Sequence, residues 1–139
     1  MNVSIVAELE GYREHVERMA ALLALETVYV RLTPSATESS YYNHGCGAVY
    51  INLNEAAITG LSTVSVIAHE LRHQYQYERG WLAGFGRWGV LYAGCWHGEY
   101  VTRRILNQEA YEQLPWEQDA NAFADTYCAQ FETTERRAA

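Results

Sequence analysis

One stretch of this chain constrains its fold more than any other: residues 64–79, V-S-V-I-A-H-E-L-R-H-Q-Y-Q-Y-E-R. Apolar side chains recur in it at intervals of three and four residues, the spacing that places them on one side of an α-helix. The pattern therefore predicts a helix that packs against a core along one apolar stripe. The stripe consists of Val64, Ile67, Ala68, Leu71 and Tyr75.

Two histidines lie at the edge of this stripe. His69 and His73 are four residues apart, so they share one helix face, and Glu70 completes an H-E-x-x-H array. Both imidazoles can bind one metal ion while the carboxylate of Glu70 reaches a water on that ion. This geometry indicates zinc-dependent hydrolysis with Glu70 as general base. The alternative is a surface helix that happens to carry two histidines, and the apolar helical context favours the metal site.

A catalytic zinc ion normally has three protein ligands and one water, so a third ligand is required. Glu117 lies in the first turn of a predicted helix whose neighbouring stripe is apolar, and the small Ala120 one turn later allows close approach. Asp119 is rotated from Glu117 by about 200° and is expected to face water. Helix geometry favours Glu117, with His97 as the alternative. The full set of candidates is Glu117, His97, Asp119, Glu99 and Cys46.

The two halves of this pattern together resemble the gluzincin metallopeptidases. The first half is His69-Glu70-Leu71-Arg72-His73, and the second is Glu117-Gln118-Asp119-Ala120-Asn121-Ala122-Phe123-Ala124. They are similar to H-E-x-x-H followed by E-x-x-A-[D/N]-x-x-A. The chain length and a predicted strand before the metal helix also resemble the minigluzincins and the small phage and bacterial peptidases that cleave repressors. The resemblance covers roughly residues 48–128.

The resemblance implies a zincin-like α+β fold, with a small, mostly antiparallel sheet packed on the active-site helix and a second helix that carries a ligand. It also implies a Zn²⁺ ion held by His69, His73 and Glu117, with Glu70 as general base. Related enzymes often have Asp where this chain has Asn121, and that residue steadies a histidine ligand. The Asn121 amide oxygen can still accept a hydrogen bond, but it brings no charge, which would weaken the site.

The expected reaction is hydrolysis of a peptide bond in a peptide or protein substrate. Bound zinc lowers the pKa of its water towards ~7, and Glu70 accepts the proton. The developing oxyanion needs a further donor. Tyr111 is the first candidate for it, followed by Tyr100 and His97. Two other functions stay open: a non-catalytic or regulatory module with structural zinc, and a zinc hydrolase that cleaves a non-peptide amide in an aromatic pocket.

The N-terminal half predicts further elements. Residues 4–25 have apolar positions at spacings of three and four, which predicts an amphipathic helix capped by Ser4. Residues 27–32 and 48–53 are rich in β-branched and aromatic side chains and predict strands. If the edge of strand 48–53 is free, an extended peptide could add to it. The polar loop between the strands holds a weaker pair of metal ligands, His44 and Cys46.

The C-terminal half is less regular. Residues 80–98 contain six Gly and three Trp, which predicts a long loop or short irregular elements whose aromatic rings pack over the core. Residues 99–112 predict another helix, and Pro115 opens the last one, because proline is favourable at the first helical position. The tail 133–139 is expected to fray. The predicted helix 99–112 would bury Tyr100, Val101, Ile105 and Leu106.

Composition narrows the partners and the compartment. With 139 residues, 49% of them hydrophobic and 19% charged, the chain is expected to form a single globular domain. A net charge of −7 disfavours nucleic acid and anionic membrane as partners. The odd number of cysteines, Cys46, Cys95 and Cys128, indicates a reducing compartment rather than a disulfide framework. Without a recognisable signal peptide or membrane span, the cytoplasm is the expected location.

Overall fold

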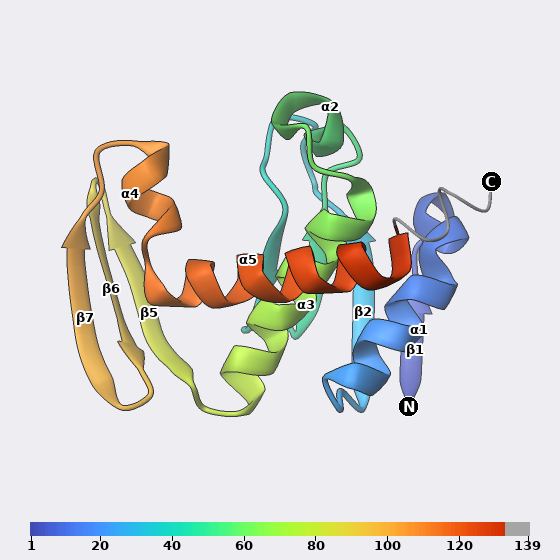
Figure 1. The fold of residues 1–139 in the computed structure, drawn as a ribbon, viewed down its shortest axis with the longest axis horizontal. Helices are drawn as coiled ribbons and strands as arrows, with labels where there is room; N and C mark the ends of the chain where they lie inside the picture. Colours follow the sequence, from blue (N-terminus) through green and yellow to red (C-terminus); the bar gives the residue numbers. More distant parts are fainter. Residues whose placement is uncertain (133–139) are drawn as a thin grey trace.

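The computed structural model describes residues 1–132, and the tail for which fraying is predicted lies outside them. The described chain has an α+β architecture, as predicted, with one four-stranded and one three-stranded sheet. Figure 1 shows the two sheets at opposite ends of the molecule, with two long helices crossing between them. No helix within residues 1–132 combines the length and the apolar character needed to cross a membrane.

The four-stranded sheet has the order β1-β2-β4-β3. Its pairs β1–β2 and β2–β4 are parallel, and only β3–β4 is antiparallel. The prediction of a mostly antiparallel sheet is therefore wrong for this sheet, because an intervening helix carries the chain from β1 to β2 in a parallel crossover. Strands 27–32 and 48–53 are confirmed within two residues. The strands are β1 (Asn2–Ile5), β2 (Thr27–Leu32), β3 (Tyr41–Asn43) and β4 (Ala48–Ile51).

The N-terminal segment differs from its prediction. Its first residues form β1, followed by the 3₁₀ helix η1 (Ala7–Tyr12) and by α1 (Arg13–Leu22). Ser4 is thus a strand residue and not a helix cap. Val3 and Ile5 alternate with polar neighbours, and pairing with β2 determines their conformation. The apolar positions in the second half of the predicted helix are buried as expected: Val16, Met19, Ala20 and Leu23.

The predicted metal helix is confirmed as α3 (Thr63–Glu78). It starts at Ser62, whose hydroxyl accepts a hydrogen bond from the Ser65 N–H at 3.1 Å, a typical N-cap. The apolar stripe packs on the four-stranded sheet and on α1. Together they form one core that includes Val28, Val30, Val49, Ile51, Val64, Ile67, Ala68 and Leu71.

The glycine-rich segment forms strands instead of the predicted loop. They are β5 (Leu82–Trp88), β6 (Leu91–Trp96) and β7 (Glu99–Arg104), which pair in an antiparallel sheet. Two glycines lie in the hairpin turns with positive φ angles, Gly89 at 63° and Gly98 at 83°. Such turns need residues that tolerate this conformation, so these glycines separate strands rather than prevent them.

The helix predicted over residues 99–112 is wrong for its first half, which is β7. Only α4 (Gln108–Glu112) is helical, and it begins at Asn107, whose side chain caps the Ala110 N–H. Tyr100 and Leu106, expected to be buried, are 72% and 67% exposed. The short α4 brings the chain back from the second sheet to the last helix, as Figure 1 shows.

The last helix, α5 (Pro115–Tyr127), begins at proline as predicted and crosses α3 (Figure 1). Ala120 and Ala124 are buried, and their small side chains allow the two helix backbones to approach closely. A π-helical turn, Cys128–Glu132, follows. The remaining helix is the short α2 (Glu55–Thr59), which lies between β4 and α3. This crossing decides which side chains of α3 and α5 meet.

Candidate metal centre

Three potential ligands from α3 and α5 converge at the crossing. The Nε2 atoms of His69 and His73 lie 3.1 Å apart. The Glu117 carboxylate approaches both, with Oε1 3.0 Å from His69 Nε2 and Oε2 3.1 Å from His73 Nε2. In a tetrahedral zinc site with bonds of about 2.0–2.1 Å, ligand atoms are roughly 3.3–3.4 Å apart. Small side-chain shifts would therefore accommodate one ion, so the donor set fits zinc in both chemistry and spacing.

The electrostatics of these three residues are those of a closely coupled group. Burial alone would raise the pKa of Glu117, but hydrogen bonds from His69 and His73 outweigh it and hold that pKa well below its usual range. Burial alone would lower the pKa of each histidine. The hydrogen bond to Glu117 outweighs burial, so the pKa values of both His69 and His73 are raised. A bound cation would take the place of the shared protons.

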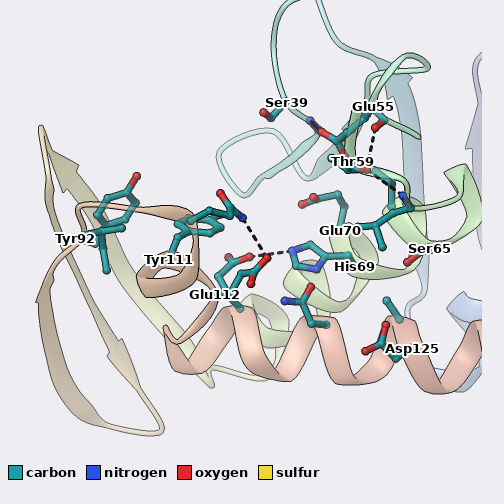
Figure 2. Close-up of a pocket in the computed structure, with 18 of the residues that line it drawn as sticks. Ser39, Glu55, Thr59, Ser65, His69, Glu70, Tyr92, Tyr111, Glu112 and Asp125 are labelled. Carbon is teal, nitrogen blue, oxygen red and sulfur yellow. Dashed lines mark hydrogen bonds and ion pairs between the residues drawn. The ribbon is translucent and has the colours of Figure 1, made fainter. Parts of the chain in front are cut away.

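Glu70 is positioned differently from the three ligands. Its side chain points into the open space beside His69 (Figure 2) and makes no hydrogen bond with any described residue, although it is only 7% exposed. Burial raises its pKa to about 8; the nearby charge of Glu117 acts in the same direction, and that of His69 opposes it. A carboxylate in this environment is a suitable proton acceptor near neutral pH.

Of the three candidate oxyanion donors, only Tyr111 lies near these residues. It projects from α4 into the cleft (Figure 2). Burial raises its pKa, and the charges of Glu117 and Glu70 and a hydrogen bond to Glu117 add to the effect, so the phenol remains protonated. His97 lies in the β6–β7 turn, with its ring 4.6 Å from that of Trp81, and does not line the cleft. Tyr100 is on the exposed side of β7.

Sequence reasoning misplaced Asp119 and overlooked Gln76. Asp119 faces water only in part, with 24% of its side chain exposed: it accepts hydrogen bonds from Arg72 Nε and Nη2, at 2.8 and 3.1 Å, because α3 covers one flank of α5. Gln76 is completely buried and links His73 to Asp119. The available signal was a polar residue one helical turn after His73, because the second ring nitrogen of a metal-binding histidine usually donates a hydrogen bond to a nearby acceptor.

Other predicted ligands and supports lie elsewhere. Asn121 lines the cleft, but no hydrogen bond joins it to either histidine among the described residues, contrary to its expected role. The ring of His44 stacks on Tyr77 at 4.6 Å, at the opposite end of α3 from the cleft walls. Cys46 is exposed and near Tyr50, and Glu99 is an exposed residue of β7.

A cleft of about 920 Å³ opens beside His69, Glu70 and Glu117. Figure 2 shows one wall with Ser39 and Glu55 and the other with Tyr92 and Tyr111. None of the tryptophans of the segment 80–98 lines this cleft, so they do not form the alternative aromatic pocket here. Strand β4 is also not an edge, since β2 and β3 flank it; β3 is the edge strand on this side.

The candidate metal centre therefore consists of side chains that α3 and α5 bring together where they cross. The Nε2 atoms of the two histidines lie 3.1 Å apart, each lies 3.0–3.1 Å from one oxygen of Glu117, and the Glu70 carboxyl group lines the cleft beside them. Comparisons of the chain with protein-family models, curated proteins and solved structures give no match.

Proposed function

We propose that this protein is a zinc-dependent metallopeptidase of the gluzincin type. One observation carries the proposal: the carboxylate of Glu117, 48 residues after His69 in the chain, lies 3.0–3.1 Å from the Nε2 atoms of both H-E-x-x-H histidines. This is the ligand set of two histidines and one glutamate that hydrolytic zinc sites use, with one position left for water. His69, His73 and Glu117 would hold the ion.

The residues around the ion would divide the remaining work. Zinc supplies Lewis acidity, which polarises the scissile carbonyl and acidifies water. Glu70 accepts a proton from the attacking water and later donates it to the leaving amine. Tyr111, which stays protonated because its pKa is raised by burial and nearby carboxylates, donates a hydrogen bond to the developing oxyanion.

A strand edge next to the cleft supports an extended peptide or protein substrate, because Ser39 and Ser40, which line the cleft, lead directly into β3. The edge strand β3 (Tyr41–Asn43) pairs with β4 on one side only, so its other edge can receive an extended peptide by main-chain hydrogen bonds. The alternative of a non-peptide amide in a tryptophan-lined pocket loses its support, because Trp81, Trp88 and Trp96 do not line the cleft.

A structural role for zinc is the second candidate, since the three ligands also join α3 to α5. The position of Glu70 favours catalysis over this role, because its carboxyl group lines the cleft beside His69 with its pKa raised to about 8, which suits a proton acceptor and is not needed in a purely structural site. A structural site would bind stoichiometric zinc, unfold on chelation and show no turnover with any peptide.

Two substitutions test the proposed function. Glu70→Gln should retain stoichiometric zinc, measured by metal analysis, and lose cleavage of a peptide library. Glu117→Ala should lose zinc, whereas His97→Ala, which removes an imidazole outside the cleft, should retain it. Normal cleavage by Glu70→Gln would contradict the assigned base, and zinc retention by Glu117→Ala would contradict the ligand set.

A further inference from the structure

Gln76 is a completely buried glutamine of α3 that makes two hydrogen bonds to α5 and one to His73 of its own helix. Its Nε2 group donates to the Trp116 carbonyl oxygen and to Asp119 Oδ2, both at 2.9 Å. Its Oε1 lies 2.8 Å from Nδ1 of His73. Every polar atom of this amide is therefore used, which is unusual for a residue placed only to fill a core.

These partners determine which way the amide points. A carbonyl oxygen and a carboxylate can only accept hydrogen bonds, so the group facing Trp116 and Asp119 must be the NH₂ of Gln76. The oxygen of the amide then faces His73, and Nδ1 of His73 must carry a proton to donate to it. Any loss of a proton, or any binding of a cation, is thereby confined to Nε2 of His73, the atom that lies near Glu117 and His69.

Asp119 is itself held in place by Arg72. The guanidinium donates from Nε and Nη2 to the two carboxylate oxygens, at 2.8 and 3.1 Å. It also lies over the aromatic rings of Tyr75 at 4.4 Å and Trp81 at 5.1 Å, which limits its motion. Asp119 is two residues after Glu117 on α5, so the contact that orients His73 also sets the position of the third ligand.

We infer that Gln76 and Asp119 are positioning residues that hold His73 with Nε2 open to a cation and bring α5 into the register that delivers Glu117. This inference rests on the proposed function, since it assigns the support of the same metal site. Partners of this kind fix the tautomer and ring orientation of a metal-binding histidine, and their loss typically weakens metal binding 10–100-fold. They take the place that the resemblance assigns to Asn121.

The first test compares two buried glutamines of the same helix. Gln76→Met should weaken zinc binding by about 10–100-fold, measured by competition with a chelating indicator. Gln74→Met is the matched control: Gln74 is 2% exposed and donates to the Thr27 carbonyl and to Glu78, away from the histidines. The control should lose stability but bind zinc like the unmodified protein. Equal zinc binding by both variants would overturn the inference.

A double-mutant cycle tests whether Asp119 acts through Gln76. Asp119→Asn keeps the size of the side chain and the packing of α5. It removes the negative charge and replaces one of the two oxygens that accept from Arg72 and Gln76 with an NH₂ group, which cannot accept, so it should also weaken zinc binding. Gln76→Met combined with Asp119→Asn should bind zinc no more weakly than Gln76→Met alone. Fully additive losses would overturn the relay. Asp119→Asn with unchanged affinity would overturn it even if Gln76→Met does not fold.

Proton NMR separates this inference from the proposed function. The Nδ1 proton of His73 should exchange slowly with solvent in the metal-free protein and should become fast in Gln76→Met. Fast exchange in the unmodified protein would overturn the inference whether or not zinc binds. A slowly exchanging proton in a protein that binds no zinc would instead refute the metallopeptidase and leave the hydrogen bond to Gln76 standing.

Discussion

At the scale of single residues, Glu70 carries a large electrostatic cost. Its carboxyl group is only 7% exposed, makes no hydrogen bond with a described residue, and has a pKa raised to about 8, first by burial. An ionised carboxylate in such a place is unfavourable unless a cation or a bound water compensates it. The residue is therefore suited to exchange a proton and poorly suited to stabilise the fold.

This cost predicts a pH-dependent gain in stability for Glu70→Gln in the metal-free protein. The pKa of Glu70 is about 8 when folded, against an ordinary value of 4.5, so the unfolded chain releases its proton first as pH rises. The stability that protonated Glu70 provides is therefore complete below about pH 4.5 and is lost as the pH rises through about 8. Glu70→Gln should be more stable by on the order of 2–3 kcal/mol at pH 7 and equal near pH 4. Urea titrations at several pH values measure the difference, and a constant offset would contradict it.

Tyr111 supports a second residue-scale prediction. Tyr111→Phe removes the hydroxyl that would stabilise the oxyanion and that also hydrogen-bonds Glu117, so kcat measured at saturating zinc should fall by about 10²-fold. The matched control is Tyr92→Phe, the same change at another cleft residue, whose ring lies 5.9 Å from that of Tyr111. Steady-state kinetics on one peptide compare them; equal losses would show that Tyr111 has no special role.

At the scale of elements, the start of α3 controls how firmly the histidines are held. The Ser62 hydroxyl accepts from Ser65 N–H at 3.1 Å and also contacts Glu132, so it joins the start of α3 to the turn after α5. Ser62→Ala should lower the free energy of unfolding by about 1 kcal/mol. Asn107→Ala, which removes the cap of the short and exposed α4, should cost within about 0.5 kcal/mol. Chemical denaturation checks both values, and the reverse order would contradict this account.

At the scale of the whole molecule, the candidate metal site joins two parts of the fold: α3 packs on the four-stranded sheet, while α5 follows the three-stranded sheet and α4. A ligand that binds only the folded protein stabilises it by mass action. Free zinc at 100 times its Kd should therefore add about 2.7 kcal/mol to the free energy of unfolding. Thermal unfolding with zinc and with a chelator measures this, with Glu117→Gln as the control that should show little gain.

This zinc-dependent stabilisation should weaken as pH falls. The pKa values of His69 and His73 are raised above 6.5, because the hydrogen bond to Glu117 outweighs burial. Protonated histidines stabilise the metal-free fold at low pH and must lose those protons to bind zinc, so competition starts above pH 6.5. The midpoint shift caused by zinc should shrink between pH 8 and pH 6. A pH-independent shift would exclude histidine ligands.

Local periodicity was sufficient to predict the elements whose conformation depends on residues nearby in the sequence. The helix carrying His69 and His73, the strands 27–32 and 48–53, and the helix that begins at Pro115 were predictable, since each depends on neighbours along the chain. The inward orientation of Glu117 was predictable for the same reason. Glycine content misled in residues 80–98, because the same residue type ends helices and forms hairpin turns.

Other features depend on which helices and strands pack together, and no local sequence pattern predicts that packing. Val3 and Ile5 form a strand because β2 lies beside them, and β2 and β4 run parallel because of the crossovers that connect the strands. Asp119 is partly covered because α3 crosses α5, and the same crossing brings Gln76 to it. The sequence by itself determined the candidate ligands and the helices that carry them. The tertiary structure decided how those ligands are supported, because hydrogen bonds between α3 and α5 exist only once the helices cross.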